Sequence, residues 1–548
     1  MDGNPSGSYK KALQLCKSRA EVSLEGGITM KNAAVRTHRS DGSVLGLELG
    51  STRIKAAVIG EDFQPIASGS YTWKSDYTDG VWTYDLAEVW TGLRAALAAL
   101  DGQEKISAMG VSAMMHGYLA FDKDWKLLVP FRTWQNTMTA QAAEELTRRF
   151  SFNIPQRWSI AHLYQAMLNG EEHVSRIAHL TTLAGYVHHA LTGEHVLGIG
   201  DASGMFPIDS AALDYDETMV RRFDDLAAEQ GMSWRLRELL PRVLTAGEQA
   251  GTLTEAGAAL LGGKIPAGIP VAPPEGDAGT GMTATNSVAP RTGNVSAGTS
   301  IFSMVVLERP LERVYPEIDL VTTPDGAPVA MVHCNNCTGD MNAWAELIRE
   351  AVGLFGTDLA PNELYDRLYQ WSTSGELDCG GVTVVNYLAG EGVTHFDRGR
   401  PLVVRPPESR LTLANFLRAQ LYSTLATLRL GMDILSREQV AIDRLTGHGG
   451  LFKTPEVGQS YLAAACGVPV TCMEMAGEGG PYGMALLAAY LLRREQGETL
   501  SDFLSKRVFQ TCSSTTLPPN QEIRAGFQAY LDRFRAALDV ERTAVAAL

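Results

Sequence analysis

Short apolar runs joined by a small-residue turn mark the first regular structure of the chain. Val44–Leu49 and Ile54–Ile59 are rich in apolar side chains, and the turn Gly50-Ser51-Thr52-Arg53 connects them. Two such runs around a glycine turn are typical of a β-hairpin. The sequence therefore predicts a hairpin over 44–59, preceded by residues 1–43 as an N-terminal extension.

Strand and helix patterns alternate after this hairpin. A third strand is predicted at Pro65–Tyr71 and a further strand at Ile106–Ser112. Between them Asp85 is a typical helix cap. Apolar residues at helical spacing follow it, namely Leu86, Val89, Trp90, Leu93, Leu97 and Leu100. The order β-β-β-α-β predicts an α/β layer.

The same strand-turn-strand pattern returns in the second half. Asn294–Ala297 and Ile301–Leu307 are joined by the turn Gly298-Thr299-Ser300. Because nearly half the chain separates the two hairpins, the pattern predicts a duplicated architecture. The stretch Ile265–Pro290 is rich in glycine, proline and alanine, which is typical of a junction. We therefore expect one domain over 44–289 and a second over 290–548.

Element boundaries can also be predicted near the C-terminal end. Thr454-Pro455-Glu456 has the cap, proline and acid of a helix start, and Gly467 is a typical helix stop. A strand is then expected at Pro469–Cys472 and another helix at Pro481–Leu492.

Composition and charge exclude some partners. The chain has 62 acidic against 47 basic residues and a net charge of -15, which is unsuited to nucleic acids or anionic membranes. No stretch approaches the roughly eighteen apolar residues of a membrane span. Seven scattered cysteines and the lack of a signal-peptide core predict a protein of the reducing cytoplasm. The sequence leaves open whether the chain forms a homodimer.

Each hairpin turn has the chemistry of a phosphate-binding loop. Glycine lets the backbone approach a ligand, and hydroxyls add donors at Ser51, Thr52, Thr299 and Ser300. Glu48 would place a carboxylate where a Mg²⁺–phosphate pair could lie. Either turn alone could be an ordinary hairpin turn. Two such turns facing each other across a cleft would bind one polyphosphate from both sides.

Other candidate residues follow predicted strands or lie in glycine loops. His116 comes just after a strand, at the edge where ligands bind in α/β folds. Trp134 and Asn136 suit stacking on a small polyol and hydrogen bonding to it, and Asp277 lies among small residues at the predicted junction. Packing for the rings and turn formation for the acid are the structural alternatives.

A glycine-rich loop, GHGGLFKTPEVGQ, ends at Gln459 and lies between a predicted strand and a predicted helix. Gly449 and Gly450 would let a flat base approach the backbone. The loop lacks the spacing of a dinucleotide fingerprint or a P-loop, so a dehydrogenase is excluded. A plain strand-to-helix connection is the alternative.

Taken in order, these segments resemble the FGGY carbohydrate kinases over about Leu45 to Leu492. LGLELGSTRIKA and SAGTS are similar to the family's phosphate motifs, MMHG to the sugar-contacting segment of xylulokinases, and EGDAGTG to the catalytic loop. VNYLAGEGVTHFD and the segment from Gly447 to Gly483 resemble second-domain motifs. The chain departs from the family pattern at Glu48, Gln135-Asn136, Met138, Gly392 and Pro481, which leaves the acceptor open.

The resemblance implies a duplicated actin/hexokinase-like (ribonuclease-H-like) α/β fold with an interdomain catalytic cleft. It implies ATP and Mg²⁺ as cofactors, Asp277 as general base, and Glu48 with Asp277 near the metal. It implies sugar contacts at Met115, His116, Gly117, Trp134 and Asn136. It implies nucleotide contacts at Gly50, Ser51, Thr52, Arg53, Gly298, Thr299, Ser300, Gly339, Gly449, Gly450 and Lys453.

The function expected from the sequence is ATP-dependent phosphorylation of a small sugar, with a ketopentose as the first hypothesis. Ribulose, another ketose or a polyol are alternative acceptors. A nucleotide-binding regulator or an actin-like assembly ATPase on the same fold is a different alternative, because fold does not fix function. Retention of both Asp277 and the Met115-His116-Gly117 segment favours the kinase.

Overall fold

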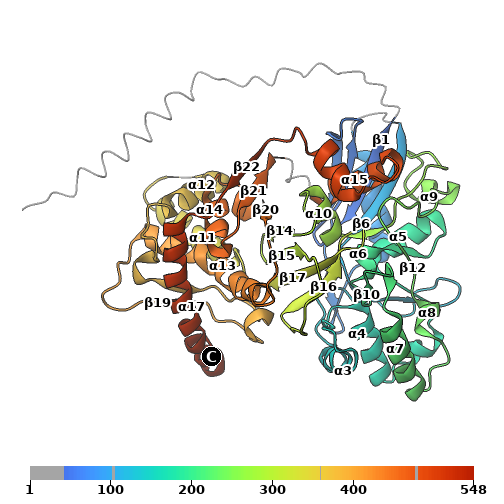
Figure 1. Ribbon diagram of the computed structural model, residues 1–548, viewed down its shortest axis with the longest axis horizontal. Coiled ribbons are helices and arrows are strands. Elements are labelled where there is room, and N and C mark those ends of the chain that lie inside the picture. The colour runs from blue at the N-terminus through green and yellow to red at the C-terminus, as the bar shows by residue number, and fades with distance from the viewer. Residues whose placement is uncertain (1–41, 101–104, 358, 475–478) are drawn as a thin grey trace, which may run out of the picture. The chain divides into compact units, whose positions relative to one another are not determined.

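A five-stranded sheet forms the centre of the first half. A computed structural model describes residues 42–100, 105–357, 359–474 and 479–548, so almost all of the predicted N-terminal extension lies outside the described residues. The strand order is β13-β6-β1-β2-β3 (Figure 1). The bounds are β1 Ser43–Leu49, β2 Arg53–Ile59, β3 Pro65–Thr72, β6 Ile106–Ala113 and β13 Glu275–Gly276.

The pairing of these strands confirms the predicted hairpin. β1, β2 and β3 are antiparallel, whereas β6 lies parallel to β1, and β13 parallel to β6. Helix α2 (Leu86–Ala98) begins as predicted, because the Asp85 side chain accepts the Ala87 N–H. β6 and β13 end at the same edge of the sheet, so the residues that follow them are brought together.

A seven-stranded sheet in the second half repeats this plan. Its order is β16-β17-β15-β14-β20-β21-β22, with the predicted hairpin formed by β14 and β15. β20 runs parallel to β14 as β6 runs parallel to β1. The bounds are β14 Thr292–Ala297, β15 Ile301–Val306, β16 Ile318–Thr322, β17 Pro328–Cys334, β20 Arg444–Gly449, β21 Val470–Met473 and β22 Ser514–Leu517.

Helices cover both sheets. Between β6 and β13 the chain forms α3 (Ala140–Phe150), α4 (Ser159–Leu168), α5 (Leu183–Thr192), α6 (Ile199–Ala202), α7 (Glu217–Glu229) and α9 (Glu255–Leu260). In the second half the main helices are α11 (Gly339–Gly353), α12 (Pro361–Ser372), α13 (Leu413–Arg437), α14 (Val457–Cys466) and α17 (Gln521–Ala547). No helix of the described segments is long and apolar enough to cross a membrane.

Helix α14 begins later than the sequence predicts. Its N-terminal cap is Glu456, whose backbone is left-handed with φ 66°, so the helix starts at Val457. Thr454 does not cap it, because its hydroxyl donates to Asp366 Oδ1 over 2.7 Å. The predicted stop at Gly467 is confirmed, since this residue is the left-handed C-cap.

Helix α15 (Gly479–Arg493) returns the chain to the first half. It packs against β1, β2, β6 and α10 (Asp277–Ala284), and Figure 1 shows it beside β1. Its residues share one core with those of the first half. The packing is close because a Cβ on Gly46 would lie 1.9 Å from the Pro481 oxygen. The division at residue 290 stays a prediction, and α15 is a C-terminal element placed on the first sheet.

Candidate active site

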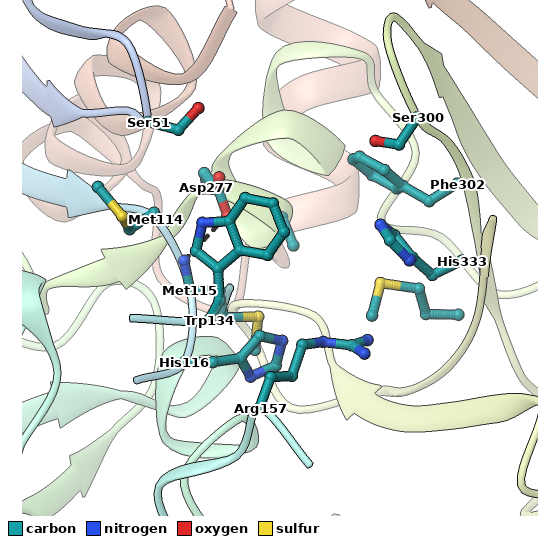
Figure 2. A pocket seen from close by; sticks show the side chains of 12 residues that line it. Ser51, Met114, Met115, His116, Trp134, Arg157, Asp277, Ser300, Phe302 and His333 are labelled. Atoms are coloured by element: carbon teal, nitrogen blue, oxygen red, sulfur yellow. Dashed lines mark hydrogen bonds between the residues drawn. The ribbon is translucent and has the colours of Figure 1, made fainter. Parts of the chain in front are cut away.

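A cavity of about 240 Å³ lies where the strand ends and hairpin turns of both halves meet. Figure 2 shows the side chains around it. The first half contributes Ser51, Met114, Met115, His116, Trp134, Arg157, Asp277 and Ala278, and the second half contributes Ser300, Phe302, Met331 and His333. The duplicated architecture thus forms one site from both halves.

Asp277 is the first residue of α10, directly after β13. The Met115 backbone N–H donates to its Oδ1 over 3.2 Å, while the rest of the side chain stays accessible from the cavity. The Asp277 side chain is exposed to the cavity, but the surrounding protein partly removes it from water, and this desolvation, together with the negative charge of Glu48, raises the pKa of Asp277 to about 6. A carboxylate with this pKa is suited to accept a proton near neutral pH.

Residues His116 and Gly117 turn the chain sharply after β6. Their φ values are 72° and 94°, and a Cβ on Gly117 would lie 2.7 Å from the Phe131 ring. His116 Nδ1 lies 3.2 Å from the Gly204 carbonyl oxygen, so Nδ1 is the protonated nitrogen. Burial and the nearby Arg157 charge hold the pKa of His116 well below its usual value. Its Nε2 can therefore accept a hydrogen bond from a ligand hydroxyl.

Trp134 and Asn136, both predicted to contact the sugar, lie in different environments. The Trp134 indole lines the cavity, but Asn136 is buried and does not. Asn136 Oδ1 accepts the Trp82 N–H over 2.9 Å, and Nδ2 donates to the carbonyl oxygens of Trp82 and Thr133. Because its amide is fully used by backbone groups, Asn136 positions the loop that carries Trp134 and does not contact the cavity itself.

The predicted nucleotide-binding residues gather around two further cavities. Gly298, Thr299, Gly450 and Lys453 line one of about 590 Å³, whereas Gly449, Gly450 and Lys453 line one of about 400 Å³. A Cβ on Gly449 would lie 2.4 Å from the Ala297 oxygen, which explains the close approach of this loop to the second hairpin.

The remaining predicted nucleotide contacts lie at turns and element ends. Gly50 and Arg53 close the first hairpin turn with a 2.9 Å backbone hydrogen bond, and Thr52 accepts the Trp73 N–H through its carbonyl oxygen. Gly339 begins α11 and lines none of these cavities, although Thr338 before it does.

Glu48 is placed near Asp277 but not on the cavity wall. Its Oε2 accepts from Lys55 Nζ over 2.8 Å, and it is buried. Within the described segments no cluster of three metal-ligating side chains exists. Asp277 nevertheless fits a divalent cation, because burial and the charge of Glu48 raise its pKa, and added positive charge stabilises such a carboxylate. Because Glu48 already pairs with Lys55, we place Glu48 near that cation but not in direct contact with it.

Six cavity residues were not among the contacts predicted from the sequence. Two of them, Met114 and Ala278, lie next to the predicted Met115 and Asp277. Phe302, Met331 and His333 come from β15 and β17, and Arg157 precedes α4. The strand residues lie in mostly buried strands, and Arg157 stands in no recognisable motif. Only the pairing of β15 with β17 places Phe302 opposite His333.

Two buried carboxyl groups, those of Glu275 and Asp201, lie close to the segment that carries Asp277. Glu275 fits against Gly198 and Gly200, and the Gly200 N–H donates to it over 3.2 Å. Asp201 accepts from the Thr182 hydroxyl over 2.6 Å. Burial raises the pKa of Glu275 to about 8 and that of Asp201 to about 7. The sequence alone did not indicate either carboxyl group as part of the site, although Glu275 stands only two residues before Asp277.

Comparison with solved structures defines the class of fold. A xylulose kinase and a gluconate kinase, both from Lactobacillus acidophilus, each match with a TM-score of 0.75 at 17% identity. The matches cover 92% and 91% of this chain and 99% and 98% of theirs. The protein therefore has the duplicated actin/hexokinase-like fold of sugar kinases, as the resemblance implied.

Comparison of sequences gives the family. The models of the N-terminal and C-terminal domains of the FGGY family of carbohydrate kinases match residues 43–283 and 293–492. The chain belongs to this family and is an ATP-dependent carbohydrate kinase.

The curated relatives differ in the acceptor that their names give. A xylulose kinase from Haemophilus influenzae is 21% identical over 78% of this chain and 83% of its own length. A glycerol kinase from Thermococcus gammatolerans is 27% identical over 33% of this chain and 40% of its own. An L-fuculokinase from Escherichia coli is 30% identical over 27% of this chain and 31% of its own length. Family membership alone therefore does not identify the sugar.

Proposed function

We propose that this kinase phosphorylates a ketopentose of the xylulose type, with Asp277 as the general base. The observation that carries the proposal is the position of Asp277 in a cavity between the two hairpin turns, beside Met115 and His116. The similarity to xylulose kinases over most of the chain supports the choice of acceptor.

The acceptor hydroxyl lies against the cavity-facing oxygen of Asp277. Asp277 takes the hydroxyl proton as the acceptor oxygen attacks the γ-phosphorus of ATP, the bond from this phosphorus to the β,γ-bridging oxygen breaks, and ADP leaves. His116 Nε2 accepts a hydrogen bond from a second hydroxyl, and the Trp134 ring packs against the apolar face of the sugar. Ser51 and Ser300 approach the transferred phosphoryl group from opposite halves. Positioning and charge stabilisation supply most of the rate in such reactions.

Nucleotide and metal binding use neighbouring groups. Gly298, Thr299, Gly450 and Lys453 line the adjoining cavity in which the nucleotide lies. Asp277, with Glu48 in the outer environment, would hold Mg²⁺, which neutralises charge on the phosphates when bound. Closure of the two halves on the bound substrates excludes water, and this limits hydrolysis of ATP.

An acceptor screen tests the proposal. ADP release is measured with MgATP and each of D-xylulose, D-ribulose, D-fructose, L-fuculose, ribitol and glycerol. We expect the highest kcat/KM with a ketopentose. A higher value with glycerol or a ketohexose would overturn the ketopentose assignment, and no release above background with any acceptor would overturn the function itself.

The pH dependence should report the ionisation of Asp277. A base acts only when it is deprotonated, so kcat/KM should rise as pH increases through about 6 and level off above it. Burial and the charge of Glu48 both raise this pKa, so replacement of Glu48 by Gln removes the second cause and should move the acid limb to lower pH. The measurement is kcat/KM at low concentrations of both substrates from pH 4.5 to 8.5. If the acid limb of the kcat/KM profile stayed at the same pH in Glu48→Gln, the charge of Glu48 would not influence the ionisation of Asp277.

A further inference from the structure

An ion pair between the halves lies at the wall of the cavity. Arg157, which lines the cavity, donates through Nη2 to Oδ2 of Asp319 on β16. Asp319 is buried, and its side chain has 9% of its surface exposed against 22% for Arg157. Asn153 donates to Oδ1 of the same carboxylate over 3.3 Å and to the Ile318 oxygen over 2.9 Å. Asp319 is thus held in place behind Arg157.

The guanidinium still has donors that face the cavity. The arginine side chain has five N–H groups, and in the described part of the chain the only hydrogen-bond partner found for the Arg157 guanidinium is Asp319. Neither Nε nor Nη1 of Arg157 is among the buried side-chain atoms that lack a hydrogen-bond partner. An acceptor in the cavity can therefore receive hydrogen bonds from them.

Arg157 marks a different end of the cavity from Asp277. Its positive charge helps lower the pKa of both His116 and His333, which places it next to these rings. The charge that acts on Asp277 is instead that of Glu48. Figure 2 shows the end of the Arg157 side chain beside the His116 ring, with Trp134 and Asp277 higher in the view. An acceptor whose reacting hydroxyl lies at Asp277 extends its other end toward Arg157.

The charges at this end sum to zero. Arg157 is positive and Asp319 negative, while both histidines are neutral because burial lowers their pKa. A neutral hydroxyl could accept from the free N–H groups without changing this balance. A carboxylate would add a second negative charge beside one cation at a partly buried ion pair, and a charge left uncompensated there is costly.

We propose that Asp319 sets the acceptor class of this kinase: by cancelling the charge of Arg157, it makes the cavity accept a neutral, hydroxylated end and reject a carboxylate. Arg157 contacts the acceptor, and Asp319 acts through Arg157 as a positioning residue. The inference rests on the proposed function and adds to it the chemical class of the acceptor and the pair of residues that selects it.

The first experiment uses the unmodified protein. D-gluconate and D-xylonate are compared with their uncharged amides, D-gluconamide and D-xylonamide, and with D-xylulose, by ADP release. Since like-charge contacts cost several kcal/mol, we expect each amide to exceed its acid in kcat/KM by about 100-fold. Equal rates with acid and amide would overturn the inference. Failure of every compound, including D-xylulose and the acceptors of the broader screen, would instead count against the proposed function.

The second experiment removes the cancelling charge. In Asp319→Asn the guanidinium is left with unbalanced positive charge, so the kcat/KM ratio of acid to amide should rise by about 10-fold or more, while KM for ATP stays unchanged. Arg157→Gln together with Asp319→Asn should restore the preference for the amide, because no cation remains. An unchanged ratio in folded Asp319→Asn would overturn the role of Asp319.

A matched control separates this effect from loss of any ion pair. Asp214 pairs with Arg237 on the surface, where both side chains are about two-fifths exposed, at 42% and 40%. Asp214→Asn removes a paired carboxylate without touching the cavity, so it should leave the acid-to-amide ratio as in the unmodified protein. The same change in ratio in Asp214→Asn and Asp319→Asn would contradict a specific role.

Discussion

Replacing Asp277 by asparagine should lower kcat by about 10²–10⁴-fold, the contribution typical of a positioned general base. The two side chains have nearly the same shape, and an asparagine oxygen can still accept the Met115 N–H that holds the loop. The variant therefore loses the proton acceptor while keeping the geometry. The measurement is kcat by ADP release at saturating acceptor and MgATP, with the ATP dissociation constant measured separately.

Stability gives the control for this loss of activity. The raised pKa of Asp277 means that the folded protein disfavours its charged form, so this group lowers stability at pH values above its pKa. Asp277→Asn removes that cost, and its melting temperature should equal or exceed that of the unmodified protein. A kcat close to the unmodified value would exclude Asp277 as the base, whereas a large fall in melting temperature would show that the variant acts through folding.

Local patterns were sufficient for the hairpins and for the first helix. The two apolar runs of Val44–Ile59 and the glycine turn between them determine a β-hairpin, and the Asp85 side chain caps α2 through a contact two residues away. Such features depend on neighbours in sequence, so they can be read without knowledge of the fold. The family resemblance then supplied the duplicated sheet plan that local patterns only suggested.

Features that depend on distant contacts could not be predicted in this way. α15 lies on the first sheet because its glycines fit against β1 and α10, a partnership that spans most of the chain. The start of α14 is displaced because Glu456 adopts a left-handed backbone, which neither its residue type nor the preceding proline indicates. Tertiary packing decided both.

The site shows the same limit. His116 and Asp277 follow strand ends, where α/β folds bind ligands, so their type and position were informative. Asn136 has the right chemistry for a sugar contact, but the backbone of Trp82 uses its amide. Arg157 and His333 enter the cavity from segments whose sequence carries no motif. Residue type indicates what a side chain can bind, and only the fold decides which groups it meets.

Substitution of Gly483 by alanine should impair both stability and catalysis. A Cβ at this position would lie 2.0 Å from the Thr280 carbonyl oxygen of α10, a backbone atom that cannot rotate away. The two helices must therefore separate, and overpacking of this kind costs about 1–3 kcal/mol. The Thr280 hydroxyl donates to the Asp277 carbonyl oxygen over 3.2 Å, so displacement of Thr280 also moves the base. A shift of about 1 Å can lower a rate by about 10²-fold.

The matched control is Gly353→Ala, at the end of α11. No atom lies within 4 Å of a Cβ built there, so the methyl group meets open space. Because alanine is favoured over glycine in a helix by about 0.5–1 kcal/mol, this variant should be as stable as the unmodified protein or slightly more so, with unchanged kcat. Urea unfolding and kcat are measured for both variants. If Gly483→Ala lost stability but kept its kcat, α10 would not transmit the displacement to Asp277, and the helix contact would serve folding alone.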